Sequence, residues 1–179
     1  MILVDIKASA VVTRINTDRH ADVFHSNDTI YALNVTKQCF EIIRKAANEW
    51  TVTKTIALQI EVIHVSATMV VTPSSVYICN HNNNVYQYSF NGELLQTVTI
   101  IEHQLANFAR MICAVDVDGR MALKAGDQLV IQHRHGSRVV KLEGVNDFYD
   151  IVFEDQHSVW ILNIVNIKKG RYDLLKLVV

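Results

Sequence analysis

The chain has 179 residues, 50% of them hydrophobic, and its 17 basic and 18 acidic residues leave a net charge of −1. This length is enough for one domain with a well-buried core, and no apolar run reaches the roughly 18 residues of a membrane-spanning helix. The near-neutral charge excludes a protein that binds nucleic acid over a strongly basic surface.

The first part of the chain alternates between β-branched runs and polar turns, which is typical of short strands. Residues 40–50 also fit a helical spacing, but the hairpin pattern before them favours a strand from Cys39 to Arg44. The β-branched composition of 51–71 favours strands as well. The strands predicted here cover 2–15, 21–24, 29–35, 39–44 and segments of 51–71.

The central stretch from Ser75 to Ile100 carries the clearest pattern. Two short strands flank the polar turn 81–84, and the second of them, 85–90, alternates apolar and polar residues. Asn91-Gly92 then predicts a type I′ hairpin with two positive-φ residues, followed by a returning strand over 94–100. This order of strands and turns is typical of much of one β-propeller blade.

The last part of the chain continues with short strands separated by turns of Asp, Gly, Glu and Lys. Residues 103–109 are expected to be a connector. The predicted strands are 111–115, 121–124, 128–133, 138–142, 149–153, 159–163 and 172–179.

Corresponding strands recur about every 40 to 55 residues, close to the period of propeller blades. We therefore predict an all-β fold, a single β-propeller-like domain over 1–179 with about four blades in a small or incomplete ring. The blade-like units are expected at about 1–50, 51–101, 110–144 and 145–179. A complete small ring, a half ring completed by a partner or a second copy, and a non-propeller all-β domain all remain open.

Two patterns suggest a metal site, and both are better explained without one. Asp116 to Gly119 resembles the start of a calcium loop, but its glycine is at the fourth position, which favours a plain hairpin turn. His133 and His135 share one face of a strand without a third ligand at a suitable spacing. We expect neither a metal nor a cofactor.

The three cysteines, Cys39, Cys79 and Cys113, form no C-x-x-C pair and fit buried thiols in a reducing compartment. The N-terminal apolar residues meet Asp5 and Lys7 too soon for a signal peptide. We therefore expect reduced cysteines and an intracellular protein, cytoplasmic or nuclear.

A basic segment within the third unit, from Arg120 to Lys141, is the one candidate contact surface. Its cations are able to touch phosphate or a protein partner, although a solvated hairpin loop with ordinary surface charge is the favoured explanation. No nucleophile elbow, P-loop or paired carboxylates mark a catalytic site, so we expect no catalytic residues. The candidate contact residues are Arg120, Lys124, His133, Arg134, His135, Arg138 and Lys141.

Three stretches carry a resemblance to a known family: Tyr149–Asn163, Val76–Phe90 and Val35–Ile43. They are similar to stretches of the WD-repeat subunit of the tRNA (guanine-N7) methyltransferase, and Ser75–Ile100 and Tyr149–Asn163 resemble degenerate WD40-type propeller repeats. The resemblance implies a non-catalytic propeller that holds a methyltransferase chain in its active form on tRNA.

The expected function is therefore a non-catalytic interaction or scaffold subunit, with accessory action on a tRNA-modifying methyltransferase as its specific form. A propeller-type hydrolase with a central site and a β-barrel that binds a small ligand are the alternatives. The apolar ends, Ile2–Val4 and Leu174–Val179, are expected to be paired sheet edges, which predicts a dimer or a hetero-complex.

Overall fold

A computed structural model gives the fold of the residues named below. These parts divide into two compact units, Met1–Val65 and Ser66–Val179, which are described separately. The described residues are 2–5, 10–14, 20–26, 28–47, 49–60, 67–80, 84–99, 113–116, 118–125, 128–133, 136–142, 148–154, 157–166 and 171–178.

Every regular element among these residues is a β-strand, so the predicted all-β fold is confirmed. The first unit contains a two-stranded sheet and a four-stranded antiparallel sheet whose strands follow one another in sequence order. The two-stranded sheet pairs β1 (Ile2–Asp5) with β2 (Ala10–Arg14). The four-stranded sheet is β3 (His20–Ser26), β4 (Thr29–Asn34), β5 (Cys39–Ala46) and β6 (Glu49–Ala57).

The strand expected over residues 39–44 is confirmed by β5, and no helix forms there. Because successive side chains of a strand point to opposite faces, β4 places Ile30 and Ala32 on one face and Leu33 on the other. Ile43 of β5 packs with the first two, and Phe40 lies opposite Leu33. Both faces of the two central strands are therefore apolar and buried.

The second unit contains three antiparallel sheets, each formed by consecutive strands. The first is β7 (Thr68–Val71), β8 (Val76–Cys79), β9 (Asn84–Tyr88) and β10 (Leu94–Thr99). The second is β11 (Cys113–Val115), β12 (Met121–Ala125), β13 (Gln128–His133) and β14 (Gly136–Lys141). The third is β15 (Phe148–Phe153), β16 (Ser158–Asn166) and β17 (Arg171–Val178).

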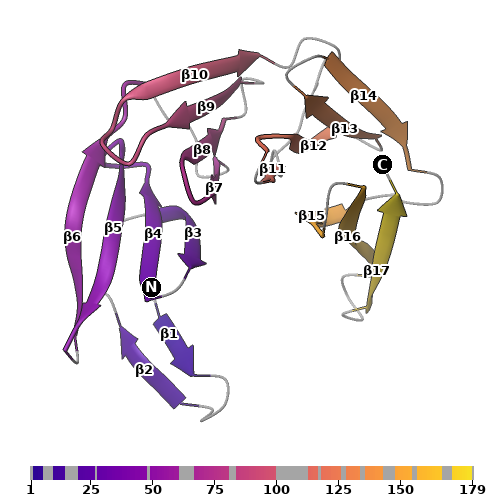
Figure 1. The fold of residues 1–179 in the computed structure, drawn as a ribbon. Helices are drawn as coiled ribbons and strands as arrows, with labels where there is room; N and C mark the ends of the chain where they lie inside the picture. The colour runs from indigo at the N-terminus through magenta and orange to yellow at the C-terminus, as the bar shows by residue number, and fades with distance from the viewer. Residues whose placement is uncertain are drawn as a thin grey trace. The chain divides into compact units, whose positions relative to one another are not determined.

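These three sheets pack face to face through two apolar clusters. Tyr77 and Val85 of the first sheet meet Leu123 and Val130 of the second. On the other face of the second sheet, Ile131 and its neighbours pack against the third sheet in a further cluster. The strand β11 contacts both β7 and β15, so the first strands of the sheets lie next to one another and the last strands lie outside (Figure 1). This is the arrangement of propeller-like blades.

The boundary expected near residue 50 falls inside a sheet. The last strand of the first four-stranded sheet is β6, which runs to Ala57 and so spans the boundary expected near residue 50. In the rest of the chain the sheets begin at Thr68, Cys113 and Phe148. The sequence after Trp50 is a long β-branched run without turn residues, so it did not indicate that β6 ends at Ala57.

The predicted turn type at Asn91-Gly92 is wrong, although the hairpin itself is present. Gly92 has a φ of 94°, but Asn91 is not among the residues with positive φ. The Gly92 N–H donates to the Ser89 carbonyl (3.1 Å) and the Ser89 N–H to the Glu93 carbonyl (2.9 Å). The connection is therefore a three-residue turn with glycine at the left-handed position, followed by a bulge, rather than a two-residue type I′ turn.

No helix among the described residues is long and apolar enough to cross a membrane.

Candidate functional site

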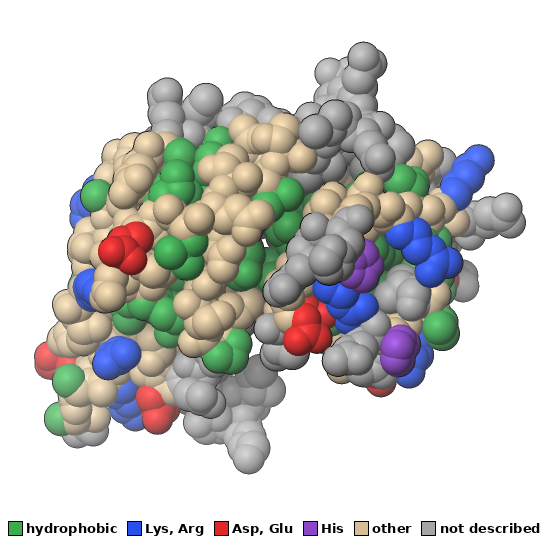
Figure 2. Space-filling model, turned by 45° about the horizontal axis from the view of Figure 1, so that its top comes forward, with side chains coloured by type: hydrophobic (Ala, Val, Ile, Leu, Met, Phe, Trp, Pro, Cys, Tyr) green, Lys and Arg blue, Asp and Glu red, His purple; other side chains and the backbone are tan. Residues whose placement is uncertain are grey.

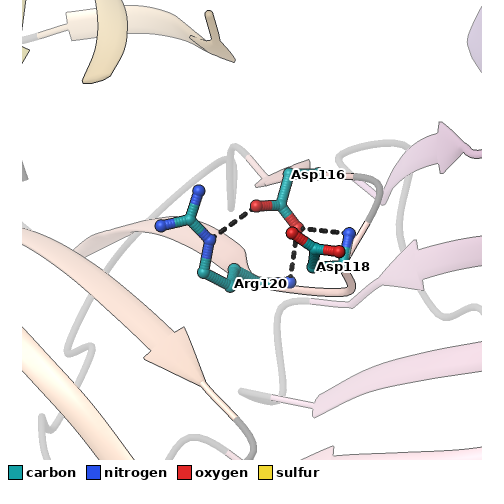
Figure 3. Close-up of polar contacts among 3 residues, drawn as sticks. All are labelled: Asp116, Asp118 and Arg120. Carbon is teal, nitrogen blue, oxygen red and sulfur yellow. Dashed lines mark hydrogen bonds and ion pairs between the residues drawn. The ribbon is translucent and has the colours of Figure 1, made fainter. Parts of the chain in front are cut away.

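The turn from Asp116 to Arg120 joins β11 to β12 and is held by one carboxylate (Figure 3). Asp116 Oδ1 accepts hydrogen bonds from the backbone N–H groups of Asp118 (3.0 Å) and Arg120 (2.8 Å). Gly119 takes a φ of 77° and donates its N–H to the Asp116 carbonyl (3.1 Å). The hairpin turn expected at this sequence is confirmed, and it repeats the construction of the turn at Gly92.

Arg120, the first of the candidate contact residues, is engaged within the fold. Its Nε donates to Asp116 Oδ2 at 2.5 Å, and only 15% of its side chain is exposed. Its guanidinium lies 5.3 Å from the centre of the Phe153 ring, at the end of β15. The guanidinium of Arg120 thus links the second sheet to the third. Because it is mostly buried and already paired with Asp116, it is poorly placed to bind an outside phosphate.

The strand pairing separates the other described candidates into two faces. Lys124 lies opposite Leu129, and Arg138 lies opposite Ile131, so both share the face that packs towards the third sheet. Lys141 is opposite Gln128 and therefore lies on the other face.

The same pairing separates the candidates along the sheet. His133 of β13 pairs with Gly136 of β14, two residues before Arg138. Gln132, next to His133, pairs with Met121, the residue that follows Arg120. The sheet therefore brings Arg120, His133 and Arg138 to one end, on one face, and leaves Lys124 and Lys141 at the other end. Arg134 and His135 lie outside the described residues.

Basic side chains and histidine appear together on the right of Figure 2, the side on which Figure 1 draws the second and third sheets of this unit. Arg138 and Lys141 are exposed on the outer strand β14. Of the candidates that the structure describes, these two are the ones classed as exposed.

A second polar cluster lies on the third sheet and is missing from the sequence-based candidates. Lys176 Nζ lies 2.5 Å from Glu154 Oε2, and the Ser158 hydroxyl donates to the same oxygen (2.9 Å). The ammonium group is also 5.6 Å from the centre of the Trp160 ring. The hydrogen bond from Lys176, followed by that from Ser158, lowers the pKa of Glu154. The sequence feature that could have indicated this cluster is Lys176, a single lysine among the apolar residues at the end of β17.

One face of the third sheet exposes large apolar side chains. Val152, Leu174 and Val178 are 57%, 63% and 75% exposed. Trp160 and Leu162 lie half-buried between them, opposite Val152 and Leu174 in the strand pairing. These five residues are called the apolar face below. The opposite face of the same sheet packs into the core with Ile151, Val159 and Ile161, so the exposure is one-sided.

The side chains that commonly bind metals do not gather in the described part of the chain. Among the described residues, no group of three or more His, Cys, Asp and Glu side chains is placed to hold a metal ion. Cys39 and Cys79 are buried free thiols, and burial raises the pKa of Cys39. The side chain of Cys113 lies outside the described part of the chain.

No family model and no curated protein matches this chain. Solved structures do. PorZ, an essential bacterial surface component of the type-IX secretion system of Porphyromonas gingivalis, matches with a TM-score of 0.54 and 14% identity. The match covers 99% of this chain but only 24% of the PorZ chain.

Two further structures match over more of their own length. A protein of unknown function from Bacteroides caccae has a TM-score of 0.59 and 15% identity, covering 96% of this chain and 69% of its own. The glutaminyl cyclase of Myxococcus xanthus has a TM-score of 0.57 and 8% identity, covering 88% and 72%. None of the three is described as a WD40 protein or a tRNA methyltransferase subunit. At these identities the likeness establishes the β-propeller-like fold alone.

Proposed function

We propose that this chain is a non-catalytic, propeller-type interaction module that acts within a protein complex. The observation that carries the proposal is the apolar face of the third sheet, where Val152, Leu174 and Val178 are more than half exposed. Exposed apolar side chains gathered on one sheet face are characteristic of protein interaction sites, and here they surround Lys176, which pairs with Glu154. The other two sheets of this unit bury apolar side chains on the faces through which the sheets pack.

The polar clusters support the same proposal because they act inside the fold. Arg120 pairs with the carboxylate of its own turn, and Lys176 of β17 pairs with Glu154 in the turn between β15 and β16. Each pair satisfies its charges across neighbouring strands, as structural ion pairs do.

The enzyme alternatives remain predictions. A hydrolase with a central site would share a fold with the glutaminyl cyclase, but 8% identity transfers no activity. The β-barrel that binds a small ligand does not agree with the separate open sheets of the second unit.

The narrower role, accessory to a tRNA-modifying methyltransferase, stays a prediction from the sequence resemblance. It would use Arg138 and Lys141, the two exposed candidates among the described residues, as contacts to RNA or to the catalytic chain. A phosphate contact from either residue would weaken as the salt concentration rises.

The proposed function is tested by comparing the proteins that co-purify with three tagged forms of the chain. These forms are the unaltered chain, Val152→Lys on the apolar face, and Leu95→Lys, a matched control because Leu95 is 52% exposed on β10. Quantitative mass spectrometry should show one set of proteins lost with Val152→Lys and kept with Leu95→Lys. Equal recovery from all three forms would contradict the proposal.

A further inference from the structure

Asn91-Gly92 is the one Asn-Gly pair in the sequence, and it lies in the turn that joins β9 to β10 (Figure 1). The side chain of Asn91 is exposed there. Glycine has no side chain to keep its backbone nitrogen away from the preceding side-chain amide. The pair therefore brings together the two groups that spontaneous deamidation needs, an amide carbon and an unhindered amide nitrogen.

Deamidation at this pair begins with attack of the Gly92 nitrogen on the side-chain amide carbon of Asn91. The new carbon–nitrogen bond closes a succinimide ring, and the bond from that carbon to the side-chain nitrogen breaks. The released nitrogen leaves as ammonia and takes up the proton that the Gly92 amide loses. Water then opens the ring at either of its carbonyl carbons, which gives aspartate or isoaspartate, so water is the co-reactant and no electrons are transferred.

Ser89 holds the attacking nitrogen and the amides on either side of it. The Gly92 N–H donates to the Ser89 carbonyl (3.1 Å). The Ser89 hydroxyl oxygen accepts from the backbone N–H groups of Asn91 (3.2 Å) and Glu93 (3.1 Å). The Ser89 N–H donates in turn to the Glu93 carbonyl (2.9 Å). Three consecutive amides are thus fixed by one residue.

These hydrogen bonds oppose ring closure. The Gly92 nitrogen must lose its proton and approach the Asn91 side chain, and both steps break its bond to Ser89. They also rotate the peptide within a turn in which Gly92 has a φ of 94°. The reactive arrangement therefore forms when the turn opens, and local opening is rarer where more hydrogen bonds hold a segment closed.

We propose that Asn91 is a deamidation site whose rate is set by the hydrogen bonds of Ser89. The closed turn preserves Asn91, and each opening exposes it to ring closure. The isoaspartate product runs the main chain through its side-chain carbon, which lengthens the turn and separates the amides that converge on Ser89. The modification would therefore loosen the β9–β10 hairpin. It is independent of the proposed function, because Asn91 lies in the first sheet of this unit and the apolar face belongs to the third.

Incubation of the full chain at mildly alkaline pH, with and without urea, tests the proposal. Peptide mapping by mass spectrometry follows the mass gain at Asn91 and separates aspartate from isoaspartate. Deamidation of the folded chain should be slower than that of the unfolded chain in urea by about tenfold or more. Equal rates in the two conditions would overturn the proposal.

A pair of serine variants tests the part played by Ser89. Ser89→Ala removes the oxygen that accepts from Asn91 and Glu93, and should raise the rate in native buffer about fivefold. Ser74→Ala is the matched control, because Ser74 is an exposed serine in the β7–β8 turn of the same sheet, and it should leave the rate unchanged.

Hydrogen exchange in β8 establishes that each variant is folded, so that acceleration by global unfolding is recognised. An unchanged rate in folded Ser89→Ala, or an equal rise in Ser74→Ala, would show that Ser89 does not protect Asn91 and would overturn the proposal. If Ser89→Ala does not fold, the comparison with and without urea still decides.

Discussion

The guanidinium of Arg120 lies 5.3 Å from the centre of the Phe153 ring. Arg120 comes just before β12 in the second sheet, and Phe153 ends β15 in the third, so the contact joins two blades. The same guanidinium is bonded to Asp116, which holds the turn that precedes it. A residue that the sequence placed in a basic contact surface therefore serves to connect two sheets.

The first prediction concerns the stability that Arg120 provides. Replacing it with alanine removes the ring contact and leaves the carboxylate of Asp116, whose side chain is 9% exposed, without its charge partner. An unpaired charge at such a site costs about 2–3 kcal/mol, so the denaturation midpoint in urea should fall clearly. Arg138→Ala is the control, because Arg138 is exposed, and should change stability by less than about 0.5 kcal/mol. Equal effects of the two substitutions would show that Arg120 is an ordinary surface residue.

The second prediction concerns the turn at Gly92. Its φ of 94° lies in the region where side chains with a β-carbon are strained, and branched ones most of all. Gly92→Val should therefore destabilise the fold by about 1–2 kcal/mol, measured by chemical denaturation. Gly92→Asn is the matched variant, because asparagine tolerates positive φ better, and it should lose less. If the valine and asparagine variants unfolded at the same midpoint, backbone strain at residue 92 would not be the cause.

The third prediction concerns the buried thiols. Cys39 and Cys79 are 2% and 0% exposed, and burial raises the pKa of Cys39, which lowers its thiolate fraction at neutral pH. Both should resist alkylation in the folded protein and react quickly in denaturant. Peptide mapping by mass spectrometry follows each cysteine separately. Rapid alkylation of either one under native conditions would mean that its strand opens readily.

Local patterns in the sequence predicted the elements of the fold well, because strands and hairpins depend on neighbouring residues. The strand over 39–44 and the hairpin at Asp116 followed from alternation and turn residues. The turn at Gly92 was assigned the wrong type, because Asn-Gly is compatible with both a two-residue and a three-residue connection. Which one forms depends on the register of the two strands, Leu94 opposite Tyr88, and not on the dipeptide.

The candidate site was less predictable, because it depends on which strands become neighbours. Arg120, Lys124 and Lys141 appear as one basic group along the sequence, but the strand pairing places them at different ends and on different faces of a sheet. The apolar strand at Leu174 was expected to be a sheet edge, which stays a prediction. Its lysine could not be matched to Glu154 without the third sheet, since the two residues are far apart in the chain.

The last prediction concerns Glu154 and pH. The hydrogen bonds from Lys176 and Ser158 lower the pKa of this carboxyl below its ordinary value of 4.5. A carboxyl whose pKa is lower in the folded than in the unfolded protein contributes its stability in full above the unfolded value. That contribution is lost as the pH falls through the folded value, so its effect is confined to acid pH.

Lys176→Met removes the largest cause of the shift and keeps a side chain of similar length. NMR titration of the Glu154 carboxyl should then give a pKa closer to its ordinary value, and the acid-induced loss of stability should become shallower. Ser158→Ala removes the second cause and should move the pKa in the same direction by a smaller amount. Because Lys176 and Glu154 are both substantially exposed, high salt should weaken the effect of the ion pair. A Glu154 pKa that stayed the same in Lys176→Met would show that the ion pair does not form in solution.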